Sequence, residues 1–312
     1  MTHDHFADRL ADACRRRGNS VCVGLDPRWD HLPREIRGRH VDGTLPALAR
    51  AFEEFCVRVV DVVAPLVPVV KPQMAFFEAC GPDGLTALRN VLGHARRRGL
   101  LTILDGKRND IASTAEAYAD AAFGGVTHGG TLHPVWDADA LTVNPYLGRD
   151  AVEPFLRSAR RDGRGVFVLV RTSNPGAYQF QDLACEGRPL FHHVAEAVGA
   201  WASENPGRCG LGDVGAVVGA THPAELTAVR ELLPDVIFLV PGYGAQGGTA
   251  PDTAPGFRAD GLGAVVNSSR GIIASFRPDE PGWEAAVEAT TRATVRALAE
   301  ATPMGRLGQA AP

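Results

Sequence analysis

Three charged residues that could perform chemistry follow one apolar run near the middle of the chain. The run, residues 100–104, reads Leu-Leu-Thr-Ile-Leu and is typical of a buried strand. Asp105 and Lys107 come directly after it, and because they are two residues apart we expect both side chains on the same side of the strand. Asp110 follows, just before a helix that we expect to begin at Ser113. The sequence therefore predicts two carboxylates around one ammonium group.

The chemistry of such a cluster depends on the charge of its lysine. Charges taken out of water cost several kcal/mol each unless they are paired, so the cluster is either a structural ion-pair network or a functional site. Nearby carboxylates favour the charged form of Lys107. An ammonium group is suited to donating a proton and poorly suited to acting as a Schiff-base nucleophile. The rest of the chain decides between the two interpretations.

The composition argues against several classes of partner. With 312 residues, of which 45% are hydrophobic, the chain can bury a large core, and its net charge of -4 argues against nucleic acid or an anionic membrane as the main partner. No apolar run is long enough to span a membrane, and the amino terminus lacks the pattern of a signal peptide. The six cysteines are scattered without a C-x-x-C pair, which indicates reduced thiols in a cytoplasmic protein. We expect no metal site and no cofactor.

Segments typical of strands and of helices alternate along the chain. The strand candidates are residues 20–25, 66–70, 100–104, 139–143, 165–170, 214–219, 236–240 and 263–266. The helix candidates are residues 4–17, 45–63, 84–98, 113–122, a helix from Ala151, and residues 190–203, 225–233 and 283–301. This alternation predicts a (β/α)8 barrel. We expect residues 1–302 to form this one domain and residues 303–312 to be a disordered tail.

Polar or glycine-rich residues follow most of the strand candidates. They include Asp26, Lys71, Asp105, Ser173, Gln246 and Arg270. In a barrel the carboxyl ends of all strands meet at one rim, which is where barrel enzymes carry their active sites. We therefore expect these side chains to share one site. Residues 124–136 and 247–261 are interpreted as loop insertions, and the first of them has no assigned role.

The segment after the seventh strand candidate fits the pattern G-x-G-x-x-G. Residues 242–247 read Gly-Tyr-Gly-Ala-Gln-Gly, for which a dinucleotide site is one interpretation. That fingerprint belongs near the first strand of a βαβ unit, and Pro251 and Pro255 cannot continue a long helix. Loops after the seventh and eighth barrel strands commonly bind phosphate through backbone N–H groups, and Arg270 would add a bidentate charge. We therefore favour a phosphate site.

These motifs together resemble those of the orotidine 5′-monophosphate decarboxylase family. Residues 105–111, Asp-Gly-Lys-Arg-Asn-Asp-Ile, are similar to its Asp-x-Lys-x-x-Asp-Ile signature. The resemblance continues in order through Gly24-Leu-Asp-Pro27, Lys71, Ser173-Asn-Pro-Gly176, Pro241-Gly-Tyr-Gly-Ala-Gln246 and Ser269-Arg-Gly271. The chain length and the segment 71–78 look most like the bacterial subgroup with longer loops, type 2.

The resemblance implies decarboxylation of orotidine 5′-monophosphate to uridine 5′-monophosphate and CO₂, in de novo pyrimidine synthesis and without a metal. By this resemblance, Lys107 protonates the pyrimidine C6, Asp105 and Asp110 crowd the substrate carboxylate, and Lys71 completes the charge network. The implied substrate contacts are Asp26 to the ribose hydroxyls, Ser173 to the pyrimidine amide edge, Gln246 to phosphate and base, and Arg270 to the phosphate. A homodimer is also implied, in which Asp110 and Thr114 reach the neighbouring subunit's site.

The chemistry of the residues agrees with this activity. Loss of CO₂ from an sp² carbon with no electron sink leaves a localised anion, and a fixed ammonium stabilises that anion more than the ground state. Binding of a phosphate remote from the reacting carbon can also drive loop closure over the site. We expect the polar loop at residues 246–260 to be the lid.

Two alternatives remain open. The first is a relative with the same barrel that acts on sugar phosphates with Mg²⁺. Such a relative needs an extra acidic ligand, whereas the second strand candidate ends in Lys71, a cation that opposes metal binding. The second is a non-catalytic phosphate-binding module that keeps its charged residues only for folding. It would bind a nucleotide without turning it over.

Overall fold

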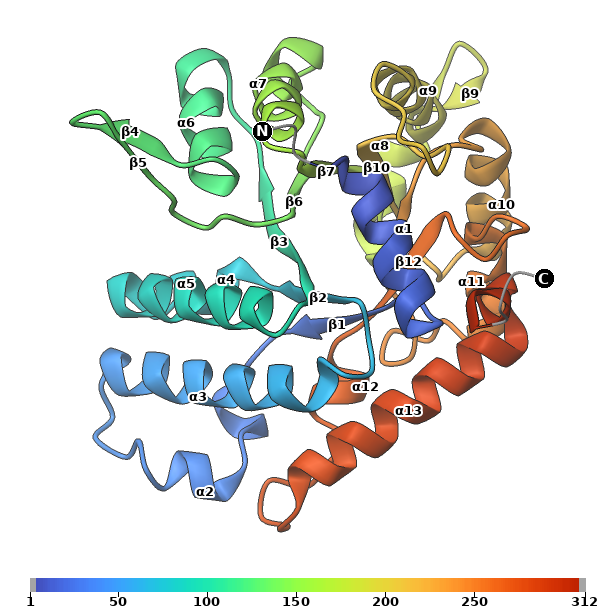
Figure 1. Cartoon of the computed structure of the whole chain (residues 1–312). Coiled ribbons are helices and arrows are strands. Elements are labelled where there is room, and N and C mark those ends of the chain that lie inside the picture. Colours follow the sequence, from blue (N-terminus) through green and yellow to red (C-terminus); the bar gives the residue numbers. More distant parts are fainter. Residues whose placement is uncertain (1–3, 309–312) are drawn as a thin grey trace.

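Eight parallel strands close into a barrel in this protein, whose computed structural model describes residues 4–308. Around the barrel the strands follow the order β1-β12-β11-β10-β7-β6-β3-β2 (Figure 1). Their bounds are β1 Val21–Leu25, β2 Val69–Pro72, β3 Leu101–Arg108, β6 Ala140–Val143, β7 Gly165–Arg171, β10 Val214–Val218, β11 Phe238–Val240 and β12 Ala264–Ser268. The predicted (β/α)8 barrel is confirmed.

The strands form from short runs of branched apolar residues. Strand β10, for example, reads Val-Gly-Ala-Val-Val and is buried at all five positions. Parallel strands that are covered on both faces are expected to be apolar throughout rather than alternating. Gly215 in β10 also makes room for a neighbour, because a Cβ at this position would lie 2.5 Å from the ring of Phe167 in β7.

Helix α1 (Phe6–Arg17) closes the amino-terminal end of the barrel. Its apolar face, including Leu10, joins the same buried cluster as side chains from inside the barrel. The ring of Phe6 meets that of Phe167 edge to face, with centroids 6.0 Å apart. A Cβ on Gly165 would lie 2.2 Å from the Phe6 ring, so glycine is required for this contact. The opposite end of the barrel, where the strands end, stays open.

The longer helices cover the outside of the barrel (Figure 1). They are α3 Leu45–Val63, α5 Gly81–Arg97, α6 Ala112–Ala122, α7 Arg149–Arg161, α9 Leu190–Ser203, α10 Pro223–Leu232 and α13 Trp283–Ala301. Helix α3 illustrates why they form. Thr44 caps its first turn by accepting a hydrogen bond from the N–H of Ala47 at 3.3 Å. One face of the helix, with Phe52 and Phe55, is buried in the core, as expected for an amphipathic helix.

Shorter elements occupy the connections and the carboxyl-terminal segment. They are the helices α2 Arg34–Arg37, α4 Met74–Glu78, α8 Tyr178–Gln181, α11 Ala250–Thr253 and α12 Arg270–Ile273, and the 3-10 turns η1 Trp29–His31, η2 Pro175–Ala177, η3 Ala254–Gly256 and η4 Pro303–Gly308. Two antiparallel hairpins pair β4 Val126–His128 with β5 Thr131–His133, and β8 Ala184–Cys185 with β9 Arg188–Pro189. The first hairpin accounts for most of the insertion at residues 124–136, and both of its strands are exposed.

The expected disordered tail needs correction. Residues 303–308 form η4, in which Met304 is fully buried. Its sulfur accepts a hydrogen bond from the N–H of Ser20 at 3.3 Å, which ties this segment to the start of β1. Burial of the Met304 side chain holds this segment in place despite its polar and glycine-rich composition. The rest of the expected tail, residues 309–312, lies outside the described residues.

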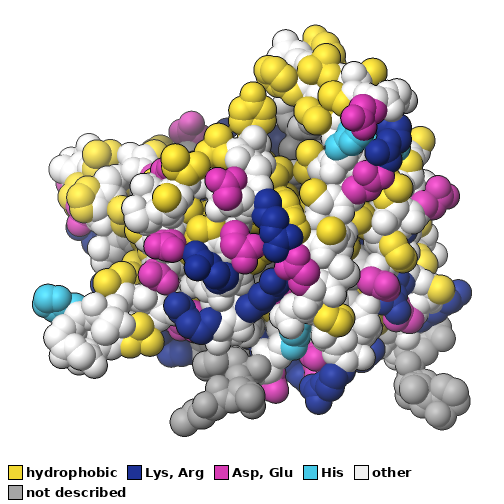
Figure 2. All heavy atoms as spheres, turned by 90° about the horizontal axis from the view of Figure 1, so that it is seen from above, with side chains coloured by type: hydrophobic (Ala, Val, Ile, Leu, Met, Phe, Trp, Pro, Cys, Tyr) yellow, Lys and Arg dark blue, Asp and Glu magenta, His cyan; other side chains and the backbone are white. Residues whose placement is uncertain are grey.

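The outer surface shows no segregation of charge on the face displayed in Figure 2. Basic and acidic side chains are interspersed there. Among residues 4–308, no helix combines the length and the apolar character needed to cross a bilayer.

Candidate active site

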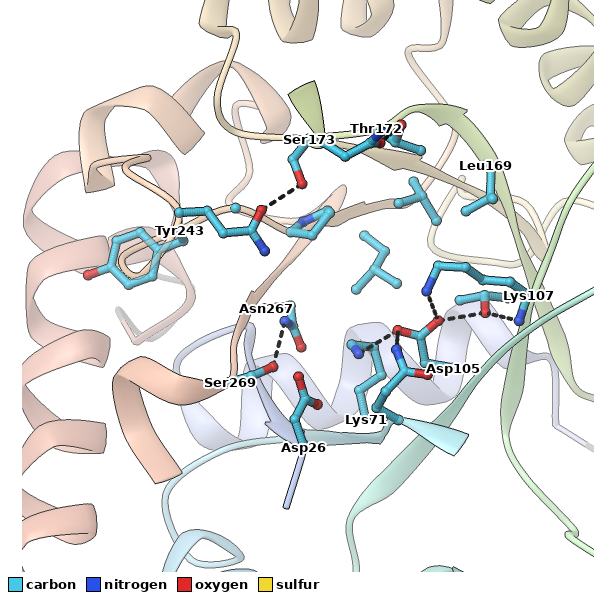
Figure 3. A pocket seen from close by; sticks show the side chains of 18 of the residues that line it. Asp26, Lys71, Asp105, Lys107, Leu169, Thr172, Ser173, Tyr243, Asn267 and Ser269 are labelled. Carbon is cyan, nitrogen blue, oxygen red and sulfur yellow. Dashed lines mark hydrogen bonds and ion pairs between the residues drawn. The ribbon is translucent and has the colours of Figure 1, made fainter. Parts of the chain in front are cut away.

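A cavity of about 890 Å³ opens at the carboxyl ends of the barrel strands (Figure 3). The residues predicted from the sequence that line it are Asp26, Lys71, Asp105, Lys107, Ser173, Gln246 and Arg270. Its other polar lining residues include Gln73, Thr142, Thr172, Asn174, Gln181, Tyr243, Asn267 and Ser269. The expectation that the strand ends converge on one site is met for these seven residues. Asp110 and Thr114 are absent from the lining of this chain's cavity.

The carboxylate of Asp105 is the centre of the charged part of the cavity (Figure 3). Its Oδ2 accepts hydrogen bonds from Lys71 Nζ at 2.7 Å and from Gln73 Nε2 at 2.9 Å. Its Oδ1 accepts from Lys107 Nζ at 2.7 Å and from Thr142 Oγ1 at 2.9 Å. The donors come from β2, the start of α4, β3 itself and β6. Four donors from four elements fix the carboxylate in one orientation.

Burial and charge act in opposite directions on these groups. Burial alone would raise the pKa of Asp105, but the two ammonium groups and their hydrogen bonds outweigh it and hold that pKa well below its usual range. Burial would likewise lower the pKa of Lys71, yet the charges of Asp105 and Asp26 outweigh it and raise that pKa. Both groups are therefore ionised at neutral pH, and the buried ion pair keeps its charges.

Lys107 reaches Asp105 through a local distortion of strand β3. Its φ is +44°, in the left-handed region that is strained for residues other than glycine. The pairing of β3 with β6 shifts register between Leu104 and Arg108. The backbone N–H of Lys107 donates to Thr142 Oγ1 at 2.9 Å, which holds the distorted turn. With 48% of its side chain exposed, Lys107 faces the cavity, whereas Lys71 is buried.

The prediction of two carboxylates around one ammonium is wrong within one chain. The structure instead places one carboxylate, Asp105, between two ammonium groups. Asp110 lies beyond the distorted end of β3, where its Oδ1 accepts a hydrogen bond from the N–H of Ile111 at 2.9 Å. Thr114 is exposed in the first turn of α6. The positive φ of Lys107 and of Ala112 turns this stretch away from the cavity of its own chain.

The choice of basic residue separates the two lysines of the cavity from the other cationic positions of the protein. The sequence has 32 lysines and arginines, and lysine occurs only at positions 71 and 107. Every other cationic position is arginine, which stays protonated under all conditions that a protein meets. Both lysines line the cavity, and lysine differs from arginine in that its ammonium can release a proton.

The opposite side of the cavity is bridged by Ser173 and Gln246. Ser173 follows β7, and its Oγ donates to Gln246 Oε1 at 2.8 Å (Figure 3). Gln246 belongs to the glycine-rich loop after β11, so the bridge joins the loops that follow the two strands on either side of β10. Its polar atoms lie across the cavity from the charged cluster (Figure 3).

The glycine-rich loop has the backbone expected of a phosphate site. Gly242, Gly244 and Gly247 all have positive φ. The helix that follows, α11, has only four residues, as expected from its prolines and unlike the long helix of a dinucleotide fold. Arg270, at the start of α12, lines the same side of the cavity, and it forms no ion pair with any side chain in residues 4–308. A guanidinium and a flexible glycine loop together suit an anion.

Two buried oxygen atoms beside these loops have no hydrogen-bond donor among the described residues. They are Oδ1 of Asp26 and Oδ1 of Asn267, which lie near each other in Figure 3. The Asn267 amide donates to Ser269 Oγ at 3.3 Å. Two acceptors without donors suit a ligand that carries hydroxyl groups.

Sequence reasoning missed the neutral side chains that position Asp105. Gln73 lies two residues after Lys71, so strand alternation could have placed both on the cavity side. Thr142 lies inside an apolar strand, where a hydroxyl gives little signal of function. The acidic groups of the lining are Asp26 and Asp105. Because Asp105 already holds two ammonium groups, this donor set is poorly suited to a divalent cation.

The chain matches a family model over most of its length. Residues 19–282 match the model described as the orotidine 5′-phosphate decarboxylase / HUMPS family. Over 293 residues the chain is 47% identical to the orotidine 5′-phosphate decarboxylase of Rhodopirellula baltica. The match covers 92% of this chain and 96% of the relative. The solved structure of the Leishmania donovani OMP decarboxylase is similar, at 34% identity and a TM-score of 0.74, and the match covers 95% of this chain and 98% of that one.

Proposed function

The chain belongs to the orotidine 5′-phosphate decarboxylase / HUMPS family, and we propose that the cavity at its barrel mouth is the site of decarboxylation. The chain is a carboxy-lyase that converts orotidine 5′-monophosphate to uridine 5′-monophosphate and CO₂ in pyrimidine biosynthesis. The single observation that supports the proposed site is the Lys71-Asp105-Lys107 cluster in the cavity.

Lys107 is the proposed proton donor. When the bond between C6 and the carboxylate carbon breaks, CO₂ leaves and the electron pair stays on C6. The Nζ of Lys107 then gives a proton to C6 and becomes a neutral amine, which regains a proton from solvent. An ammonium held in place before the reaction stabilises the developing carbanion without reorganisation. Its contact with Asp105 at 2.7 Å supports this role.

Asp105 and Lys71 are proposed to set the electrostatics of this step. The low pKa of Asp105 keeps it ionised, so it repels a substrate carboxylate placed beside it and favours loss of that charge as CO₂. Lys71 neutralises the second oxygen of Asp105 from the buried side and holds the carboxylate still. A metal ion has no step to perform in this scheme.

The remaining predicted residues are proposed to hold the substrate. Arg270 and the glycine loop would bind the phosphate, and the Ser173–Gln246 bridge would contact the base. The unpartnered oxygen of Asp26 would accept from ribose hydroxyls. Phosphate and base would then lie on the side of the cavity opposite Asp105, with C6 directed toward Lys107.

We also propose a cytoplasmic homodimer whose sites are completed across the interface. Asp110 and Thr114 lie outside their own chain's cavity, which agrees with a role in a neighbour's site. Large apolar side chains are exposed around them, namely Ile111 and Tyr118 on or beside α6 and Tyr146 and Leu147 after β6. An apolar patch rimmed by polar residues is typical of a protein interface. Residues 4–308 would form the single domain of each subunit.

The proposed lid is shorter than the expected span of residues 246–260. Thr253 is fully buried and Phe257 nearly so, which anchors the second half of that span to the barrel. The part of the lid that is not anchored in this way is the stretch around Gln246 and its neighbouring glycines. Hydrogen exchange with and without a nucleotide inhibitor tests this. Protection confined to residues 243–249 is expected, and equal exchange in both states would contradict a lid.

The proposed function is tested by following loss of the orotate absorbance band on addition of orotidine 5′-monophosphate. The assay contains EDTA and compares the wild type with Lys107→Ala. Turnover by the wild type and its loss in the variant are expected. Arg97→Ala, on the solvent side of α5, serves as a matched control that keeps wild-type turnover. Activity that requires added Mg²⁺ would favour the sugar-phosphate alternative, and nucleotide binding without turnover would favour a binding module.

A further inference from the structure

We propose that Arg171 is a positioning residue that holds the loop carrying Ser173 in the shape needed to contact the substrate base. This inference rests on the function proposed above. Arg171 is the last residue of β7 and lies two positions before Ser173. It does not line the cavity, so it acts through its neighbours rather than on the substrate.

Arg171 is a charged residue that is only 4% exposed. A buried guanidinium is tolerated when its donors are paired, and here several partners share it. Its Nε donates to Glu225 Oε2, and its Nη2 donates to Glu225 Oε1 and lies 3.1 Å from Asp182 Oδ1. The ring of Phe191 packs against the guanidinium, with the central carbon 5.4 Å from the ring centroid. These partners come from α10, the end of α8 and α9, so one side chain gathers three elements behind the loop.

The amide of Gln181 connects this cluster to the loop. Its Oε1 accepts hydrogen bonds from Arg171 Nη1 at 3.3 Å and from the N–H of Thr172 at 2.9 Å. Its Nε2 donates to Thr172 Oγ1 at 2.8 Å, and that hydroxyl in turn donates to Asn174 Oδ1 at 2.6 Å. These hydrogen bonds fix Thr172 and Asn174, the residues on both sides of Ser173. The side chain of Ser173 takes no part in them and lines the cavity.

The far side of Ser173 is held by a close backbone approach. A Cβ on Gly219 would lie 2.9 Å from the Cβ of Ser173, so the end of β10 packs directly against this residue. The pairing of β7 with β10 shifts register just before this point, between Val217 and Val218. Ser173 thus sits between a glycine on one side and the Gln181 amide system on the other, and its Oγ reaches Gln246 at 2.8 Å.

The geometry requires an arginine at position 171. A planar guanidinium directs donors to Glu225, Asp182 and Gln181 at once, whereas an ammonium is a compact charge without that fork. Glu225, which lies in α10, orients the guanidinium of Arg171 by accepting two of its hydrogen bonds. Replacing Glu225 with glutamine keeps its size but removes the charge that holds Arg171, and this should loosen the Ser173 loop.

The test is a double-mutant cycle between Glu225→Gln and Ser173→Ala, read as kcat/KM for orotidine 5′-monophosphate. Glu225→Gln alone should lower kcat/KM by about 10-fold or more, because small displacements of a positioned group are costly to catalysis. In the Ser173→Ala background the same substitution should change kcat/KM by less than about 2-fold, because the group it positions is already gone. If the ion pair of Arg171 and Glu225 were purely structural, the fold-changes in kcat/KM caused by the two single substitutions would multiply in the double variant.

Two further variants keep the result interpretable. Gln181→Ala cuts the connection to the loop but leaves the buried ion pair, and it should show the same coupling to Ser173→Ala even where Glu225→Gln folds poorly. Asp213→Asn is the matched control, since Asp213 is buried, pairs with Arg160 at 3.0 Å and precedes β10 at the closed end of the barrel. Asp213→Asn should lower the melting temperature, and its fold-change in kcat/KM should multiply with that of Ser173→Ala.

Each outcome is distinct. Wild-type protein without turnover would refute the proposed function itself. Wild-type turnover combined with multiplicative effects of Glu225→Gln and Ser173→Ala would refute the positioning role alone. Ser173→Ala without any effect on kcat/KM would also refute it, because Arg171 would then have no functional group to position.

Discussion

The ammonium nitrogen of Lys107 lies 2.7 Å from Oδ1 of Asp105, while the other oxygen of the same carboxylate is held by Lys71 at the same distance. The two lysines differ in access, since Lys71 is buried and Lys107 faces the cavity. One carboxylate therefore lies between a buried ammonium and an ammonium that faces the cavity. This arrangement leads to the following expected outcomes.

Lys107→Arg should abolish turnover although it conserves the charge. A guanidinium does not release its proton at any pH that the protein survives, so proton donation to C6 would fail. We expect kcat to fall by about 10³-fold, within the range of general acid–base catalysis. Binding of uridine 5′-monophosphate, measured by calorimetry, should persist. A variant with more than about a tenth of wild-type kcat would contradict the role of Lys107 as proton donor.

Asp105→Asn should destabilise the fold at neutral pH and less so in acid. Removing one member of a buried charge cluster leaves Lys71 unpaired, at a cost of about 3 kcal/mol or more. Because the pKa of Asp105 is lowered in the folded state, its contribution to stability is present above the unfolded pKa and is lost as pH falls toward the folded pKa.

Urea unfolding of the wild type and of Asp105→Asn at several pH values measures this difference. The gap in unfolding free energy should be largest near pH 7 and should narrow from about pH 5 downward. Asp12→Asn is the control, since Asp12 is exposed and pairs with Arg15 at 3.4 Å. Its effect should stay within about 0.5 kcal/mol throughout. A gap that widens in acid would contradict the low pKa of Asp105.

Arg270→Ala should weaken the use of substrates that carry a phosphate. Loss of a bidentate charge on the phosphate should lower kcat/KM for orotidine 5′-monophosphate by about 10²-fold. Turnover of orotidine, which lacks the phosphate, should be nearly unchanged by the same substitution. The two rates are compared in the absorbance assay. Equal losses with both substrates would show that Arg270 acts elsewhere than at the phosphate.

Two inactive variants should restore activity when mixed, provided that subunits exchange. In a hybrid dimer of Lys107→Ala and Asp110→Ala, one site contains both substitutions and the other contains neither. Random exchange should therefore recover about a quarter of the native activity, as the two-fold symmetry of a dimer requires. Unfolding and refolding the variants together promotes exchange. Hybrids without activity, at a mass of two subunits, would indicate that Asp110 serves its own chain.

The barrel and the residues at its mouth could be predicted from local sequence pattern. Strands such as β10 are apolar throughout because helices cover them, and helices such as α3 carry a cap and one buried face, so local pattern was enough to predict them. The parallel topology then brings the strand ends to one rim. Asp26, Ser173 and Arg270 could therefore be assigned to one site, although they lie far apart in the chain.

The pairing of the charges depends on contacts between elements that are distant in the chain. The order of residues predicted Lys107 between two carboxylates, but Lys107 has a positive φ and Asp110 lies outside the lining of the cavity. The partners of Asp105 include a residue of a neighbouring strand, Thr142, and the partners of Arg171 include a residue of a helix far along the chain, Glu225. Their spacing along the sequence carries no signal, because hydrogen bonds between elements depend on register and packing rather than on local pattern.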